Sequence, residues 1–405
     1  MSDLQLWVCA GSLLVIGTVM ILSSTFSMQA RAGEDPLLYL KKHLIALILG
    51  LIVMAVFMYF DFDHLKTLAI PIYVLTVLAL GMVLLRGFIA LGAQRWVAIG
   101  PVSFQPSEVA KLATIIVLAA YLESRVGTLS NLLALLPPAL LVGLPFVLIF
   151  KQPDLGTSLV LIAILLGMFL WAKASEGLLL LLFSPLLGIF LYQHFVIWVL
   201  YMVILTTVLF SVKFKWFDCL TIIALNIVSP RVFYHVFNML KGYQKTRLLA
   251  FLNPNIDPRG AGYHSLQSKV AIGSGGFFGR GLFHGTQTQL QFIPQQFSDF
   301  IFSAVGEELG FIGAVAVVVL FTIIILRAIK IASESRTPFG SFLAGGIAVM
   351  FMFHMLVNIG MTMGLLPVVG IPLPFMSFGG TALLVDLAAV GILQNIAMRR
   401  SKIIF

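Results

Sequence analysis

The chain has 405 residues, of which 60% are hydrophobic and 10% are charged, whereas a soluble domain carries about 25% charged residues. This composition excludes a soluble globular protein and indicates a polytopic membrane protein. The net charge of +9 is explained by basic residues flanking apolar spans rather than by a nucleic-acid surface, and the two cysteines support neither a disulfide framework nor a zinc site.

Runs of about 20 apolar residues, the length that a helix needs to cross a bilayer, predict the membrane segments. Twelve such runs lie at residues 6–25, 43–60, 67–85, 106–122, 132–149, 154–172, 177–194, 196–212, 217–239, 300–326, 341–363 and 380–398. We therefore expect an all-α fold with about 10–12 transmembrane helices, forming one integral membrane domain over residues 1–405.

The basic residues predict the orientation, because cytoplasmic loops carry an excess of Lys and Arg. With a cytoplasmic N-terminus, residues 240–299 form a large extracytoplasmic loop before the last three helices. This loop nevertheless contains Lys241, Lys245, Arg247, Arg259, Lys269 and Arg280. Such charges indicate an anionic ligand, most simply phosphate or pyrophosphate, and the alternative is pairing with anionic lipid headgroups.

Polar residues recur at the same outer level in the first half of the chain. Residues 86–105, which include Arg95, are interrupted by Gly and Pro and are expected to form an amphipathic stretch in the interface. Glu108 and Lys111 have i, i+3 spacing and are expected to pair, either as a clamp between helices or in contact with a ligand. Lys151 and Asp154 form a second polar cluster with both signs of charge.

Three carboxylates mark the predicted tenth helix. Asp299 begins it, and Glu307 and Glu308 are expected roughly 12–14 Å deeper at 1.5 Å per residue. Carboxylates at that depth are expected to face the interior of the bundle, with a donor partner or a raised pKa. Residues 366–381 contain three prolines and three glycines and predict a re-entrant or outer loop, whereas Asp386 in the last helix has no assigned role.

Residues 253–313 form the least apolar stretch, which is rich in Gly, Pro, Gln and Ser and includes Asp257. Irregular backbone of this kind lies outside the bilayer or against a polar cavity. Its glycines suit close approach to a ligand with many acceptor oxygens. The alternative is a flexible linker, which the interspersed Ile272, Phe277 and Phe283 disfavour.

Five ordered stretches resemble the shape, elongation, division and sporulation family of peptidoglycan polymerases. They are GAQRWVAIGPVSFQPSEVAKL, KQPDLGTSLV, GYQKTRLLAFLNPNIDPRGAGY, SDFIFSAVGEELGFIG and LPVVGIPLPFMSFGGTALL. YHSLQSKVAIGSGG followed by HGTQTQLQFIP is more similar to the elongation branch, represented by RodA, than to the division branch, represented by FtsW. The resemblance implies a glycosyltransferase that polymerises lipid II on the outer face of the bacterial cytoplasmic membrane during cell elongation.

The resemblance also implies residue roles. The key acid of the family falls on Asp257, which is expected to act as the base that deprotonates the GlcNAc 4-hydroxyl while this oxygen attacks the donor carbon with inversion. The expected substrate-binding residues are Arg95, Glu108, Lys111, Lys151, Asp154, Tyr243, Arg247, Gln267, Ser268, Asp299, Glu307, Glu308 and Ser377. A divalent cation, Mg²⁺ or Mn²⁺, is the candidate cofactor, with Asp257 as a candidate ligand, and no organic cofactor is expected.

The partners implied by the resemblance are lipid II, the undecaprenyl-pyrophosphate-linked glycan, a class B penicillin-binding transpeptidase, MreC- and MreD-like elongation proteins and membrane lipids. One departure from the family pattern is visible, because residues 177–239 have room for three helices where the family has one. Such an extra helix pair keeps the catalytic loop outside. A lipid II flippase is the alternative function, and a non-catalytic scaffold is a third; Asp257→Asn separates both from a polymerase.

Overall fold

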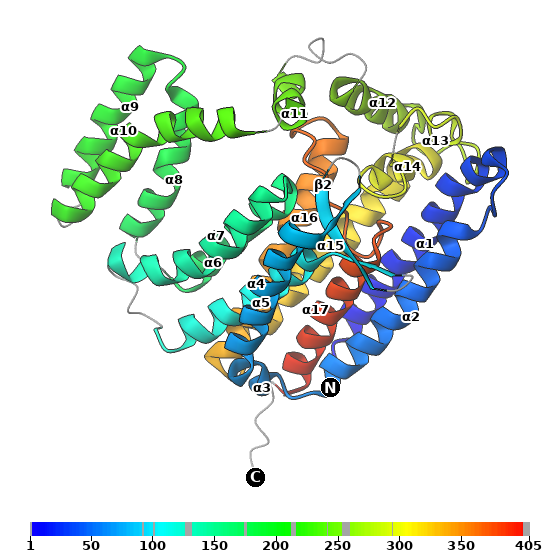
Figure 1. Cartoon of the computed structure of the whole chain (residues 1–405), viewed down its shortest axis with the longest axis horizontal. Coiled ribbons are helices and arrows are strands. Elements are labelled where there is room, and N and C mark those ends of the chain that lie inside the picture. The colour runs from blue at the N-terminus through cyan, green and yellow to red at the C-terminus, as the bar shows by residue number, and fades with distance from the viewer. Residues whose placement is uncertain are drawn as a thin grey trace.

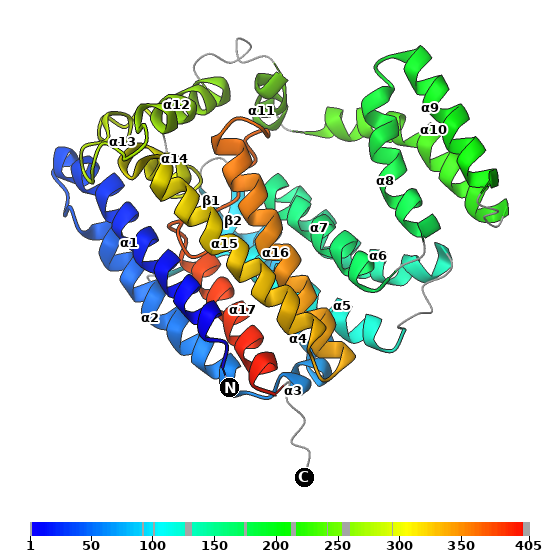
Figure 2. The same cartoon turned by 180° about the vertical axis from the view of Figure 1, so that it is seen from behind.

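The computed structural model describes residues 2–90, 93–99, 102–125, 132–173, 176–211, 216–240, 242–252, 260–293 and 295–399. Long helices form a bundle, with the start of the first helix, the end of the last helix and the short helix α3 (Phe62–Thr67) at one face (Figures 1 and 2). The opposite face carries α11 (Gly242–Leu252), α12 (Ala261–Ser274) and α13 (Thr286–Gln289). We refer to this face as the α12 face.

Eleven of the twelve predicted ranges each coincide with one α-helix, and the range 300–326 holds two. The bundle consists of α1 (Leu4–Ala32), α2 (Leu38–Tyr59), α4 (Ala69–Arg86), α5 (Pro106–Glu123), α6 (Leu136–Lys151), α7 (Leu155–Trp171), α15 (Gly310–Ser333), α16 (Pro338–Thr362) and α17 (Gly380–Arg399). Six helices among the described residues are long and apolar enough to cross a membrane: α1, α2, α10 (Trp216–Met239), α15, α16 and α17. Shorter apolar stretches lie in α4, α6, α7 and α9 (Phe195–Ser211). The prediction of an all-α polytopic membrane fold is therefore confirmed.

Helices α16 and α17 form the centre of the bundle, because 78% and 89% of their most apolar windows are buried. Helix α2 packs along α17, and this contact is close at Gly391, where a Cβ would lie 2.5 Å from the carbonyl oxygen of Met54. In lipid, small residues of this kind allow helix backbones to approach each other. The main apolar core lies along these helices and their neighbours.

Three helices stand apart from the bundle in both views: α8 (Glu176–Leu191), α9 (Phe195–Ser211) and α10 (Trp216–Met239) (Figures 1 and 2). They occupy the range where the sequence indicates an extra helix pair. They pack on one another around their own apolar cluster of Leu205, Leu209, Cys219 and Ile222. Only 17% of the apolar window of α10 is buried, so this unit, the α8–α10 unit, presents most of its surface outward.

Two predicted elements differ in the structure. The predicted tenth helix is two helices, α14 (Ile301–Glu308) and α15, because Gly310 adopts a φ of +67°, which is a left-handed conformation that interrupts the helix. Residues 86–105 do not form one amphipathic stretch. They contain β1 (Phe88–Ala90), β2 (Ala93–Ile99) and β3 (Val102–Phe104), which pair as an antiparallel sheet in the order β1-β2-β3.

The stretch 253–313 is also more regular than expected. It was predicted to be irregular, yet its described part contains α12, α13, α14 and the start of α15. A further short turn of helix, η1 (Leu132–Leu135), precedes α6. Most of the site residues that the sequence singles out lie on helices, and Arg247 of α11 and Gln267 and Ser268 of α12 lie at the α12 face.

Candidate functional site

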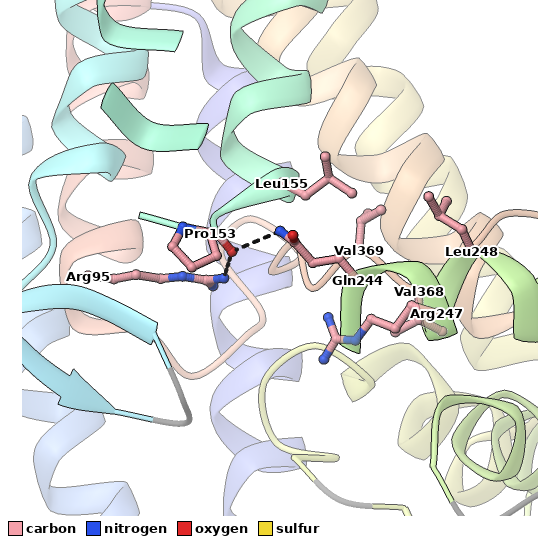
Figure 3. Close-up of a pocket in the computed structure, with 8 residues that line it drawn as sticks. All are labelled: Arg95, Pro153, Leu155, Gln244, Arg247, Leu248, Val368 and Val369. Atoms are coloured by element: carbon pink, nitrogen blue, oxygen red, sulfur yellow. Dashed lines mark hydrogen bonds between the residues drawn. The ribbon is translucent and has the colours of Figure 1, made fainter. Parts of the chain in front are cut away.

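A narrow pocket lies where β2, the turn between α6 and α7, α11 and the loop before α17 meet. It is lined by Arg95, Pro153, Leu155, Gln244, Arg247, Leu248, Val368 and Val369 (Figure 3). Its volume is about 10 Å³, which is room for one water molecule. These residues come from four separate stretches of the sequence, so the fold gathers several of the motifs that resemble the polymerase family.

Arg95 connects β2 to the turn between α6 and α7. Its guanidinium donates to the carbonyl oxygen of Gln152 at 3.3 Å and to that of Pro153, and it lies 3.8 Å from the Asp154 carboxylate. Gln244 of α11 donates to the same Pro153 carbonyl at 3.4 Å, and Figure 3 shows both donors converging on this oxygen. One backbone acceptor thus joins the sheet, the turn and α11.

Asp154 is a buried structural carboxylate at this turn. It caps the N-terminus of α7 by accepting from the Thr157 N–H at 3.3 Å and from the Thr157 hydroxyl at 2.9 Å. Gln105 and Ser107 at the start of α5 donate to Asp154 Oδ2, the oxygen that also accepts from the Thr157 hydroxyl, at 3.3 and 3.4 Å. A carboxylate at a helix N-terminus is favoured by the helix dipole and by the unpaired N–H groups there.

Asp299 and Arg247 converge on the loop before α17. A Cβ at Gly370, whose φ is +73°, would lie 3.1 Å from Asp299 Oδ2 and 3.5 Å from Arg247 Nη1. Burial raises the pKa of Asp299, although the hydroxyl of Ser298 and the charge of Arg247 act in the opposite direction. The positive charge of Arg247 therefore lies beside a buried carboxyl group whose pKa is raised.

The loop before α17 is fixed by one side chain of α16 and one of its own. Asn358 of α16 donates to the carbonyls of Asp299 and Ile371, at 2.9 and 2.7 Å. The Ser377 hydroxyl donates to the Ser298 carbonyl at 2.7 Å and accepts from the Leu373 N–H at 2.8 Å. Ser377 thus positions the loop instead of pointing into the pocket as a ligand-binding group.

A charged cluster is buried in the centre of the bundle. Lys111 Nζ donates to Glu108 Oε2 at 2.7 Å and to His354 Nε2 at 2.9 Å. Because the Met350 carbonyl can only accept from His354 Nδ1, at 2.7 Å, the proton of the neutral ring lies on Nδ1 and Nε2 accepts. Asp386 faces the same charges and accepts from the N–H of Phe375.

The two adjacent glutamates of α14 lie elsewhere. Both are buried and have donor partners, as the sequence predicts, but they end a short helix and are not deep inside a long one. Glu307 accepts from the N–H groups of Gln287 and Thr288 at 2.8 and 2.9 Å, and Glu308 accepts from the Ser23 hydroxyl at 2.6 Å. They hold the segment around α13 in place, and they do not line the pocket.

The remaining expected residues divide into three groups. The Ser268 hydroxyl is buried and donates to the Thr362 carbonyl at 2.6 Å, which gives it a packing role. Lys151 is exposed and Gln267 is partly exposed, and neither lines the pocket. The Tyr243 side chain and the whole of Asp257 lie outside the described residues.

Sequence reasoning missed several residues of this region. Gln244 donates into the pocket wall, Asn358 ties two loops together and His354 completes the buried cluster. Gln244 lies inside the GYQKTR motif, so its neighbours could have drawn attention to it. His354 and Asn358 lie singly on an apolar helix, where the sequence carries no signal of a partner.

The described residues offer no ready metal site. No group of three His, Cys, Asp or Glu side chains in the described ranges could hold a metal ion. Asp257, the expected ligand, falls in the undescribed range 253–259. These residues therefore do not fit a cation by themselves, and the chemistry below is assigned to side chains alone.

Comparison with protein families identifies the type of protein that the chain resembles. A family model described as cell cycle protein, covering FtsW, RodA and SpoVE, matches residues 3–199 and 177–402. The chain is 34% identical over 400 residues to the peptidoglycan glycosyltransferase MrdB of Escherichia coli (strain K12), covering 97% of this chain and 94% of that protein. It is 33% identical over 414 residues to the peptidoglycan glycosyltransferase RodA of Treponema pallidum (strain Nichols), covering 95% of each.

Solved structures show the same architecture. A chain from a peptidoglycan synthase complex, studied for how it coordinates polymerization and crosslinking, matches with a TM-score of 0.72 at 27% identity over 99% of both chains. The crystal structure of the Thermus thermophilus rod shape determining protein RodA matches with a TM-score of 0.63 at 25% identity, over 99% of this chain and 98% of that chain. The fold described above is thus shared over almost the full length.

Proposed function

This chain belongs to the FtsW/RodA/SpoVE family of cell cycle proteins, and we propose on that basis that it is a peptidoglycan glycosyltransferase that joins lipid II units during cell elongation. The observation that carries the proposal is the pocket at the α12 face. Beside Asp299, this pocket brings together residues from separate family-like motifs, namely Arg95, Gln244, Arg247 and the Pro153 turn. Full-length similarity to proteins named as peptidoglycan glycosyltransferases supports the same conclusion.

The proposed reaction is a single displacement at the anomeric carbon of the donor. The 4-hydroxyl oxygen of the acceptor GlcNAc forms the new bond, the bond to the pyrophosphate oxygen breaks, and Asp257 takes the hydroxyl proton. Base assistance of this kind contributes about 10²–10⁴ in rate. One displacement inverts the donor carbon.

The departing pyrophosphate needs positive charge close to the reacting centre. Arg95 and Arg247 line the pocket from opposite walls (Figure 3). Guanidinium groups bind phosphate oxygens in a bidentate manner, and such charge-assisted hydrogen bonds are stronger than neutral ones. Because the pocket has room for only one water molecule, we place both the pyrophosphate and the sugars outside its mouth, with Arg95 and Arg247 as the groups that contact the pyrophosphate.

We further propose the setting of this reaction. The α12 face lies on the outer side of the bacterial cytoplasmic membrane, where polyprenyl-linked substrates are presented. A class B penicillin-binding transpeptidase is the proposed partner, supported by the likeness to a chain of a synthase complex that both polymerises and crosslinks. MreC- and MreD-like elongation proteins are the further proposed partners.

A lipid II flippase is the second candidate function, because the buried cluster of Glu108, Lys111, His354 and Asp386 places charge inside the bundle, as transporters do.

An assay of purified protein with lipid II, followed by a gel of the glycan products, distinguishes a polymerase from a flippase. Asp257→Asn should remove glycan synthesis at an unchanged melting temperature. Asp35→Asn, which alters an exposed carboxylate paired with Lys41 between α1 and α2, should synthesise normally and is the control. Wild-type rates in folded Asp257→Asn protein would disprove the base assignment.

A further inference from the structure

The α8–α10 unit is held together by a polar network as well as by its apolar cluster. The Tyr201 hydroxyl donates to the Ser184 carbonyl at 2.7 Å and lies 2.9 Å from Asn226 Oδ1, while Asn226 Nδ2 donates to the Ser184 hydroxyl at 2.8 Å. Hydrogen bonds between helices in an apolar setting define one packing arrangement. The surfaces between these helices are therefore preformed.

A groove of about 720 Å³ lies between the second halves of α8 and α10. Its apolar lining comes from Leu186, Ile189, Phe190 and Phe233. Tyr192 and Tyr234 also line it, and tyrosine is enriched at the boundary between hydrocarbon and headgroups. The groove thus offers apolar side chains for a hydrocarbon chain and polar side chains for a headgroup.

Arg231 and His235 supply positive charge to the same groove. They are spaced i, i+4 on α10, both are exposed, and Gln193 faces them from the end of α8. No described carboxylate lines the groove, and within the described chain neither Arg231 nor His235 has a hydrogen bond or an ion pair. Arg231 lies about 22 Å along α10 from Trp216, at 1.5 Å per residue, which is within a helix that is able to span the bilayer.

A cation at that position is costly unless an anion compensates it. The described part of the chain supplies none at this groove, so we look for the counter-charge in the surrounding membrane. We propose that this groove binds an anionic phospholipid, with the phosphate held by Arg231 and His235 and one acyl chain lying along the wall between α8 and α10. This site is separate from the pocket at Arg95 and Arg247, and it does not depend on the catalytic proposal.

The test uses the full-length protein in phosphatidylcholine vesicles that contain a photoreactive phosphatidylglycerol, with crosslinked peptides mapped by mass spectrometry. Crosslinks should fall within residues 176–239, and the double substitution Arg231→Gln with His235→Gln should reduce them about tenfold, the effect of losing about 1.4 kcal/mol of binding. Arg231→Lys should retain most of the labelling. The control is Lys42→Gln, which removes an exposed cation from α2 and should change nothing.

The competing outcomes are distinct. Equal labelling by photoreactive phosphatidylcholine would overturn the proposal, because it would show that the groove does not select charge. Displacement of the photoreactive lipid by inorganic phosphate alone would indicate a site for free anions. Stronger displacement of this lipid by polyprenyl phosphate than by phosphatidylglycerol would indicate a site for a carrier lipid. Either result would overturn the assignment to phospholipid. Unchanged labelling in the double variant, with an unchanged melting temperature, would do the same.

Discussion

The buried contact between Lys111 and Glu108 permits a quantitative test of whether the central charges are structural. Both side chains are almost fully buried, at 2% and 3% exposure. Lys111→Met keeps the volume but leaves Glu108 charged and without its cation. Removing one partner of a buried pair costs about 3–5 kcal/mol, whereas removing both is often neutral. We therefore expect Lys111→Met to lower the melting temperature by several degrees and Glu108→Gln with Lys111→Met to restore most of it.

The contact between Lys111 and His354 leads to a second prediction, for a variant in which the two charges are exchanged by Glu108→Lys and Lys111→Glu. In the wild type, His354 Nε2 accepts from Lys111 at 2.9 Å. After the exchange a carboxylate faces this lone pair, so the two acceptors repel each other unless the ring gains a proton. The exchanged variant should therefore recover only part of the stability, and adding His354→Gln, whose amide can donate, should recover more.

The assay is thermal unfolding in detergent, followed by tryptophan fluorescence, alongside lipid II polymerisation by each variant that remains folded. A melting temperature of Lys111→Met equal to that of the wild type would refute the argument, as would a double variant less stable than the single one. Restored stability without restored polymerisation would show that the charges also act in the reaction, because stability alone would then not explain their effect.

Three further predictions follow from other parts of the structure. Burial raises the pKa of Asp299, so ionising this carboxyl group above its ordinary pKa of 3.8 lowers the stability of the folded protein. As the pH rises through the raised pKa, the melting temperature of the wild type should therefore fall relative to that of Asp299→Asn. Parallel plots of melting temperature against pH for the two proteins would contradict this. Glu307→Gln removes one of the two carboxylate oxygens that accept from backbone N–H groups, and leaving such a group unpaired costs about 1–3 kcal/mol. The backbone amides of Gln287 and Thr288 should therefore exchange faster with deuterium. Glu334→Gln, which changes an exposed carboxylate, is the control. In a background without Cys9 and Cys219, Ser265→Cys should react with an impermeant reagent in intact cells and Ser211→Cys only after permeabilisation; the reverse pattern would invert the proposed orientation.

The long helices could be predicted from the sequence because bilayer thickness determines their length, and an apolar run of that length has few alternatives. The break at Gly310 was missed because a single glycine in an apolar run resembles a tolerated helix residue. The sheet of β1, β2 and β3 was missed because its strands are short and the intervening Gly and Pro obscure their alternation. In both cases the local pattern fits two structures, and tertiary packing selects one.

The candidate site was predictable only in part. Arg95 and Arg247 line the pocket and Asp299 lies beside it, and charge alone had marked all three. Glu307 and Glu308 carried the same signal of buried charge, yet their partners are main-chain groups and hydroxyls that no spacing rule connects to them. Sequence shows which side chains need a partner, but the partner is decided by contacts between distant segments.

The carbonyl of Pro153 has a consequence for how this protein can vary. It accepts from Arg95 of the sheet and from Gln244 of α11. Since the acceptor belongs to the main chain, no substitution at position 153 removes this oxygen. Substitutions can remove these two hydrogen bonds only by replacing the donor side chains. Loss of either donor breaks the connection between sheet and helix at this oxygen but leaves the other bond in place, so the turn loses both attachments only in two steps. Lineages can therefore pass through single changes at position 95 or 244 while the turn keeps one of its attachments.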